Sequence, residues 1–126
     1  MKKNEIITAL IVDDVAEMRS LLKTTLLKVG VTNIVEADSA HTALARYRES
    51  RSNIVFLDIN MPGESGISLL EVLREEDKFS YVVMVSGDST VDNVKTTIGL
   101  GARGFVVKPY TLSKIEEVVK RYRTQY

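Results

Sequence analysis

The sequence contains no cysteine, which excludes disulfide bonds, thiolate catalysis and cysteine-ligated zinc sites. Its charges balance, with 17 Lys and Arg against 17 Asp and Glu, so no net field draws it to nucleic acid or to a membrane surface. No apolar run approaches the roughly 20 residues of a membrane span. The run at residues 6–12 is interrupted by Thr8 and stopped by two aspartates, which does not resemble a signal peptide. These absences predict a cytoplasmic protein that contacts neither membrane nor nucleic acid directly.

Short apolar segments instead alternate with stretches of helical periodicity along all 126 residues. Each apolar segment reads as a buried strand, and a helix-like stretch follows each one. No linker, repeat or low-complexity tract interrupts the alternation, so we expect a single domain over residues 1–126. This pattern predicts a parallel sheet with helices on both faces. The expected strands lie at residues 7–12, 33–37, 54–58, 81–85 and 105–107.

Two doubly wound folds are compatible with this alternation, and the turn after the first strand separates them. A half-size nucleotide-binding Rossmann unit requires a glycine-rich turn there. The sequence has Asp13-Asp14-Val15 instead, without glycine. We therefore expect a flavodoxin-like (βα)5 fold, doubly wound, with a five-stranded parallel sheet in the order 2-1-3-4-5.

Polar side chains follow the expected strands at their carboxyl ends, where ligands of open parallel sheets bind. Asp13 and Asp14 follow the first strand and Asp58 ends the third. In the order 2-1-3-4-5 these strands are neighbours, so the three carboxylates converge and need a cation. Oxygen-only ligands favour Mg²⁺. Ser86 and Lys108 end the fourth and fifth strands, where they could bind the oxygens of a phosphoryl group transferred to Asp58.

Each of these residues also has an ordinary structural interpretation. Asp13 and Asp14 could cap the following helix, Lys108 could be a solvated lysine, and Phe105 a plain core aromatic. His41 has no partner in the sequence and is read as a surface residue. Only the joint arrangement favours a chemical role over these interpretations.

The motifs together resemble a known family. Asp13-Asp14, Asp58 followed by Asn60-Met61-Pro62, Ser86-Gly87, and Phe105 to Lys108-Pro109 occur in this order. This set is similar to the receiver domain of two-component response regulators, of the stand-alone CheY-like type. The resemblance covers the whole chain.

The resemblance implies a role for each site residue. Asp58 would accept a phosphoryl group, with Ser86 and Lys108 binding its oxygens. Asp13, Asp14 and Asp58 would hold Mg²⁺ together with the backbone carbonyl of Asn60. The donor would be a histidine kinase or a histidine phosphotransfer protein. The chain would catalyse only its own phosphorylation and dephosphorylation, and would not be an enzyme with a turnover substrate.

The resemblance also implies a conformational switch. Phe105 would turn inward as Ser86 moves toward the phosphoryl group, changing the surface formed by the fourth helix, fifth strand and fifth helix. A target protein of unknown identity would bind this surface, and the chain would be a monomer or a phosphorylation-dependent dimer. The Lys108–Pro109 peptide bond would be cis. Asn60 and Asp88 occupy variable positions that tune the phosphoaspartate lifetime in this family.

Two other classes of function remain open at the sequence level. One is an interaction module on the same fold that works without phosphorylation, although every acidic, hydroxyl and lysine position is intact. The other is a phosphatase or phosphotransferase with an aspartyl nucleophile. Such hydrolases carry a general acid two residues after the nucleophile, and Asn60 cannot act as one.

Overall fold

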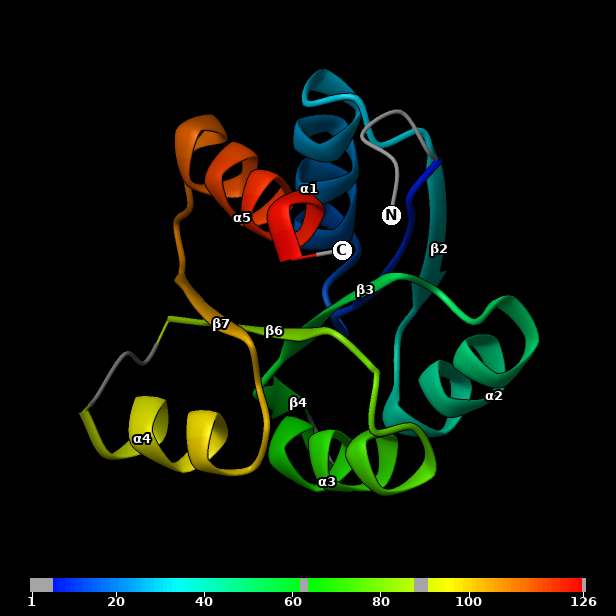
Figure 1. Cartoon of the computed structure of the whole chain (residues 1–126), viewed down its shortest axis with the longest axis vertical. Helices are drawn as coiled ribbons and strands as arrows, with labels where there is room; N and C mark the ends of the chain where they lie inside the picture. Colours follow the sequence, from blue (N-terminus) through cyan, green and yellow to red (C-terminus); the bar gives the residue numbers. More distant parts are fainter. Residues whose placement is uncertain (1–5, 62–63, 88–90, 126) are drawn as a thin grey trace.

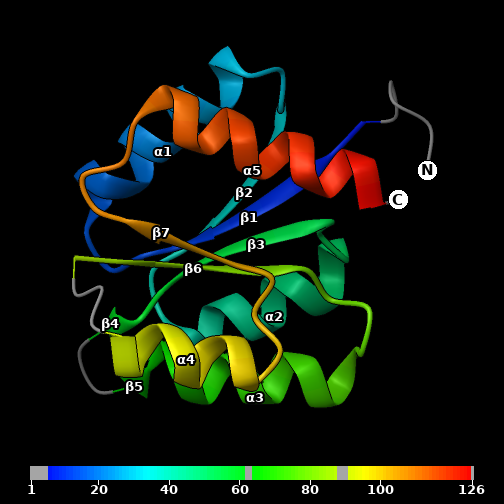
Figure 2. The ribbon, with the colours of Figure 1, turned by 60° about the vertical axis from the view of Figure 1, so that its left-hand side comes forward.

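A parallel sheet of five strands forms the centre of the structure, a computed structural model that describes residues 6–61, 64–87 and 91–125 (Figures 1 and 2). The strands lie in the order β2-β1-β3-β6-β7. If only the five strands of this sheet are numbered in chain order, β6 and β7 become the fourth and fifth strands and the order is 2-1-3-4-5. The predicted flavodoxin-like topology is therefore confirmed. The strands are β1 (Thr8–Val12), β2 (Asn33–Ala37), β3 (Ile54–Asp58), β6 (Val82–Ser86) and β7 (Gly104–Val107).

Helices cover both faces of this sheet, as the alternating pattern predicts. The helices α1 (Ala16–Lys28) and α5 (Leu112–Gln125) lie on one face. The opposite face is covered by α2 (Ala40–Ser50), α3 (Gly66–Glu76) and α4 (Val91–Gly99). Within the described ranges, none of these helices has the length and apolar character needed to cross a bilayer.

The sheet separates two apolar cores. Every residue of β3 is buried, and alternate side chains point to opposite faces. Phe56 belongs to the core beneath α1 and α5, whereas Leu57 belongs to the core beneath α2, α3 and α4. Burial on both faces explains the uninterrupted apolar run before Asp58. A carboxylate at the end of this strand therefore lies at the centre of the sheet edge.

The helical spacing of apolar residues predicts inward-facing positions for Leu21, Ile98 and Leu112, but all three are exposed. In α1, the buried residues are Leu22, Thr25 and Leu26, and Leu21, about 100° around the helix from Leu22, lies outside this buried face. Apolar periodicity located the helices correctly but overestimated the width of their buried faces.

A second, two-stranded sheet follows β3 directly and was not predicted. It pairs β4 (Asn60–Met61) with β5 (Glu64–Ser65) in antiparallel register. Two-residue strands carry no periodicity, so the sequence indicated only a turn at Pro62 and Gly63. These two residues and Asp88 lie outside the described residues. The short sheet returns the chain to the edge of β3 before α3 begins.

In the sequence, Gly30 predicts the end of the first helix and Ser39 the cap of the second, and both predictions are confirmed. Ser39 accepts a hydrogen bond from the Thr42 backbone N–H at 3.1 Å and so caps α2. Gly30 follows the end of α1 with a φ of 92°, a conformation that glycine adopts without a steric penalty.

Candidate functional site

Three carboxylates meet at the carboxyl-terminal edge of the sheet, as the strand order predicts. Asp13 and Asp14 follow β1, and Asp58 ends the neighbouring strand β3. One oxygen of each carboxylate lies within 4.8 Å of the others. Asp13 and Asp58 are each only 5% exposed, whereas Asp14 is open to solvent. The cluster is thus two buried acids and one accessible acid.

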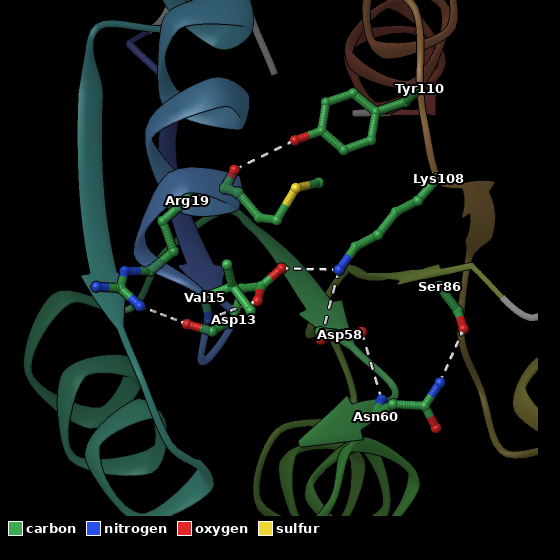
Figure 3. Close-up of polar contacts among 9 residues, drawn as sticks. Asp13, Val15, Arg19, Asp58, Asn60, Ser86, Lys108 and Tyr110 are labelled. Carbon is green, nitrogen blue, oxygen red and sulfur yellow. Dashed lines mark hydrogen bonds and ion pairs between the residues drawn. The ribbon is translucent and has the colours of Figure 1, made fainter. Parts of the chain in front are cut away.

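Lys108 joins this cluster from the far side of β6. Its Nζ lies 2.9 Å from Asp13 Oδ2 and 3.5 Å from Asp58 Oδ2 (Figure 3). The long side chain spans the two inter-strand spacings between β7 and β3, about 10 Å. One ammonium set against three carboxylates leaves the site negatively charged. The site therefore still attracts a cation.

The pKa of Asp58 is raised above its ordinary value, chiefly because burial removes the carboxylate from water. The Lys108 ammonium opposes this effect and lowers the pKa, while the neighbouring Asp13 charge raises it. The Asn60 backbone N–H also favours the ionised form, by donating to Asp58 Oδ1 at 3.3 Å. The ionised Asp58 is held at an energetic cost in this position, and any added cation would relieve that cost.

Asp13 is fixed by three contacts at the start of α1. Its backbone N–H donates to the Ala37 carbonyl at 3.2 Å, and its carbonyl accepts from Arg19 Nη1 at 2.6 Å. Its Oδ1 accepts from the Val15 backbone N–H at 2.9 Å (Figure 3). The N-cap of α1 is Val15, without a side-chain hydrogen bond. Neither aspartate is the N-cap, so helix capping does not account for the acidic pair.

Ser86 lies on the opposite side of Asp58 from the acidic pair, because β6 is the other neighbour of β3. Its side chain is buried, and its Oγ accepts from Asn60 Nδ2 at 3.4 Å (Figure 3). Its carbonyl accepts from the Lys108 backbone N–H at 2.9 Å. The contact of the Asn60 side chain was not predicted, since the sequence pointed only to the backbone carbonyl of this residue.

Gly66, the first residue of α3, is a second feature that the sequence did not reveal. Its N–H donates to the Ile59 carbonyl at 2.9 Å, and it is buried against the backbone of Asp58 and Ile59. A Cβ at this position would lie 2.8 Å from the Ile59 Cα and closer still to the Asp58 carbonyl oxygen. A glycine at a helix start is the one sequence signal for this close approach.

Tyr110 is the third unpredicted residue near the site. Its hydroxyl donates to the Met18 carbonyl in α1 at 3.3 Å, which ties the segment after Lys108 to the helix that follows Asp13 (Figure 3). Burial, with a smaller contribution from the Asp13 charge, raises the pKa of Tyr110 to about 12. The phenol therefore stays protonated at neutral pH and keeps its hydrogen to donate.

The remaining predicted residues lie in β7 and just beyond it. Phe105 is half-buried and packs against the core beneath α2, α3 and α4. The Lys108–Pro109 peptide bond is cis, as the family resemblance implies. The switch role of Phe105 stays a prediction.

Asp58 opens into a cleft of about 860 Å³ between the loops at this edge of the sheet. Polar groups of Asp14, Asn60 and Lys108 line it together with apolar side chains, of which Val15 and Ile67 are two. The cleft is large enough for a small phosphorylated group to reach Asp58. The Asp58 and Asp14 carboxylates and the Lys108 ammonium thus line a solvent-accessible cavity, and Asp13 and Ser86 lie buried beside Asp58.

This fold and this site are those of an aspartate-centred signalling receiver. A family model described as the response regulator receiver domain matches residues 9–120, and the chain belongs to this family of two-component signalling proteins.

Curated relatives place it among CheY-like receivers. It is similar to the chemotaxis protein CheY of Pseudomonas aeruginosa, with 35% identity over 89% of this chain and 92% of that protein. The CheY protein of Bacillus subtilis is 33% identical over 89% of this chain and 93% of its own length.

Solved structures give the same result. The CheX–CheY–BeF3–Mg²⁺ complex from Borrelia burgdorferi matches with 30% identity and a TM-score of 0.88, covering 96% of this chain and 97% of that one. The receiver domain of NtrX from Brucella abortus matches with 29% identity and a TM-score of 0.87, covering 94% of this chain and 99% of that one.

Proposed function

We propose that this chain is a Mg²⁺-dependent phosphoacceptor in which Asp58 receives a phosphoryl group from a histidine kinase or a histidine phosphotransfer protein. One observation carries the proposal. The buried Asp58 carboxylate lies within 4.8 Å of two further carboxylates and 3.5 Å from the Lys108 ammonium, at the floor of an open cleft. Nothing in the packing of the sheet requires three acids at this edge.

The residues present fit a Mg²⁺ ion. The donor atoms are all oxygens, they lie close enough to share one ion, and Asp14 is accessible for its entry. Asp13, Asp14 and Asp58 would hold the ion together with the Asn60 backbone carbonyl. When bound, Mg²⁺ offsets the repulsion between the carboxylates and the incoming phosphoryl oxygens. The Borrelia relative was solved as a complex with both BeF3 and Mg²⁺.

The transfer step assigns a task to each side chain. An oxygen of the Asp58 carboxylate forms a bond to phosphorus as the bond from phosphorus to the donor breaks, and the electron pair leaves with the donor. Lys108, which lies between Asp13 and Asp58, and Ser86, on the other side of Asp58, bind phosphoryl oxygens. Lys108 also opposes the effect of burial on Asp58 and favours its ionised, nucleophilic form. The chain catalyses only its own phosphorylation and dephosphorylation.

The phosphoryl group then switches a surface by shifting a conformational population. Ser86 leaves its contact with the Asn60 amide to bind the phosphoryl group, and Phe105 repacks. The affected surface consists of α4, β7 and α5, and it presents the exposed apolar side chains of Ile98, Val107 and Leu112. A downstream target protein binds this surface in the cytoplasm, and the chain is a monomer or a phosphorylation-dependent dimer.

Intact-mass spectrometry tests the acceptor. The wild type, Asp58→Asn and the control Asp38→Asn are incubated with acetyl phosphate and Mg²⁺, with and without EDTA. Asp38 is a matched control because it is an exposed aspartate just after the neighbouring strand β2. We expect one phosphoryl adduct on the wild type and on Asp38→Asn, absent from Asp58→Asn and abolished by EDTA. If neither acetyl phosphate nor beryllofluoride modifies or binds the wild type, the chain is an interaction module that works without phosphorylation.

A further inference from the structure

Val15 occupies a position that the fold does not explain. It is the N-cap of α1, yet its side chain makes no capping hydrogen bond and is 41% exposed. Helix N-caps favour Ser, Thr, Asp or Asn, and valine is among the poor choices. An exposed valine at this position lowers the stability of the helix and makes no compensating contact in the core. Such a residue points to contact with a ligand.

The location of Val15 indicates which ligand. It lines the cleft above Asp58, and its backbone N–H is bound to Asp13 beside the proposed metal ligands (Figure 3). In phosphoryl transfer the attacking and leaving atoms lie roughly in line across phosphorus. The leaving group of a donor bound to Asp58 therefore points away from Asp58 into the cleft, where Val15 is an exposed lining residue.

Other apolar side chains of the cleft are already engaged. Met61 is only 8% exposed and belongs to the core beneath α2, α3 and α4, together with Ile59. Ile67 is half-buried and packs against the same core. Among the described apolar residues that line this cleft, Val15 is the most exposed to an incoming group. A flat, largely apolar ring is the leaving group that suits it.

We propose that Val15 packs against the imidazole ring of the phosphohistidine donor and thereby favours phosphohistidine over donors without a ring. This inference rests on the proposed function of Asp58. An Asp58 oxygen forms its bond to phosphorus while the P–N bond breaks. The electron pair stays on that nitrogen, and the ring, protonated on its other nitrogen before transfer, leaves as neutral imidazole. Val15 takes no part in the chemistry and acts by holding the departing ring.

The test compares donors of matched chemistry. Monophosphoimidazole carries the ring, phosphoramidate has a P–N bond without a ring, and acetyl phosphate has neither. The measured quantity is the ratio of the second-order phosphorylation rate constants for monophosphoimidazole and phosphoramidate. Loss of about 40 Å² of ring contact predicts a fivefold fall in this ratio for Val15→Ser. Val15→Thr, which keeps the branched shape, should give a smaller fall.

Two controls separate this effect from a loss of folding. Leu27→Ser removes an equally exposed apolar side chain from the other end of α1 and should keep the wild-type ratio. Serine is a better N-cap than valine, so the melting temperature of Val15→Ser should rise, by about 3 °C. A lower donor ratio in a more stable protein is a result that a purely structural role of Val15 does not produce.

The possible outcomes are distinct. A wild-type ratio in both Val15 variants would overturn the inference and leave Asp58 as the acceptor. A similar fall in Leu27→Ser would also overturn it, since the effect would then not belong to the cleft. If no donor, acetyl phosphate included, phosphorylates the wild type, the proposed function fails and this inference fails with it.

Discussion

The close approach of Gly66 to the end of β3, beside Asp58, can be tested by adding one methyl group. Gly66→Ala adds a Cβ against the Asp58 carbonyl oxygen and 2.8 Å from the Ile59 Cα, and all of these obstructing atoms are backbone. A rotamer change cannot relieve such a clash, so α3 must move away from β3 or the end of β3 must shift. Overpacking of this kind costs about 1–3 kcal/mol. Because backbone is involved, we expect about 3 kcal/mol, a large fraction of the stability of a domain of this size.

Urea denaturation followed by circular dichroism measures this loss, and Gly99→Ala is the matched control. Gly99 ends α4, and a Cβ there meets no atom within 4 Å, so alanine should keep or slightly raise the stability. Because Asp58 lies at the clash, the acetyl phosphate reaction of folded Gly66→Ala should also slow. A Gly66→Ala protein as stable and as reactive as Gly99→Ala would refute the packing described for this site.

Two further predictions concern the charges of the site. Burial raises the pKa of Asp58 above its unfolded value, so the folded state binds protons more readily than the unfolded state, and stability falls as pH rises through this range. Asp58→Asn measured in EDTA should therefore melt at a higher temperature than wild type at pH 7. The difference should vanish as the pH falls toward the ordinary aspartate value of 3.8, and an equal gain at every pH would contradict this. Mg²⁺ at about 100 times its dissociation constant should raise the free energy of unfolding by about 2.7 kcal/mol. Asp14→Asn, which removes an exposed carboxylate that packing does not need, should reduce this gain at the same Mg²⁺ concentration, and an unchanged gain would exclude Asp14 as a ligand.

The sequence predicted best the elements that are marked by a pattern of apolar residues and by turn residues at their ends. The strand at Asn33–Ala37 and the end of β3 at Asp58 were predicted to the residue, because apolar runs and turn residues mark both. The convergence of Asp13, Asp14 and Asp58 followed from topology alone, since adjacent parallel strands end at the same edge. Family resemblance supplied the roles of these residues, which periodicity could not.

The features that the sequence did not predict depend on contacts without a local pattern. The Asn60 amide reaches Ser86, 26 residues away, and the Tyr110 hydroxyl reaches Met18, 92 residues away. In the sequence, nothing distinguishes Asn60 or Tyr110 from a solvent-exposed residue in a loop. The steric need for glycine at position 66 likewise appears only when the β4–β5 pair brings α3 against β3.

The ion pair between Lys108 and Asp13 has a consequence for synthesis of the protein. It joins residues 95 positions apart, so the ammonium is added to the acidic cluster only after β7 has emerged from the ribosome. A nascent or truncated chain that ends before β7 contains all three aspartates but not the ammonium that offsets part of their charge. The complete charge arrangement therefore exists only in a chain that has folded through its last strand.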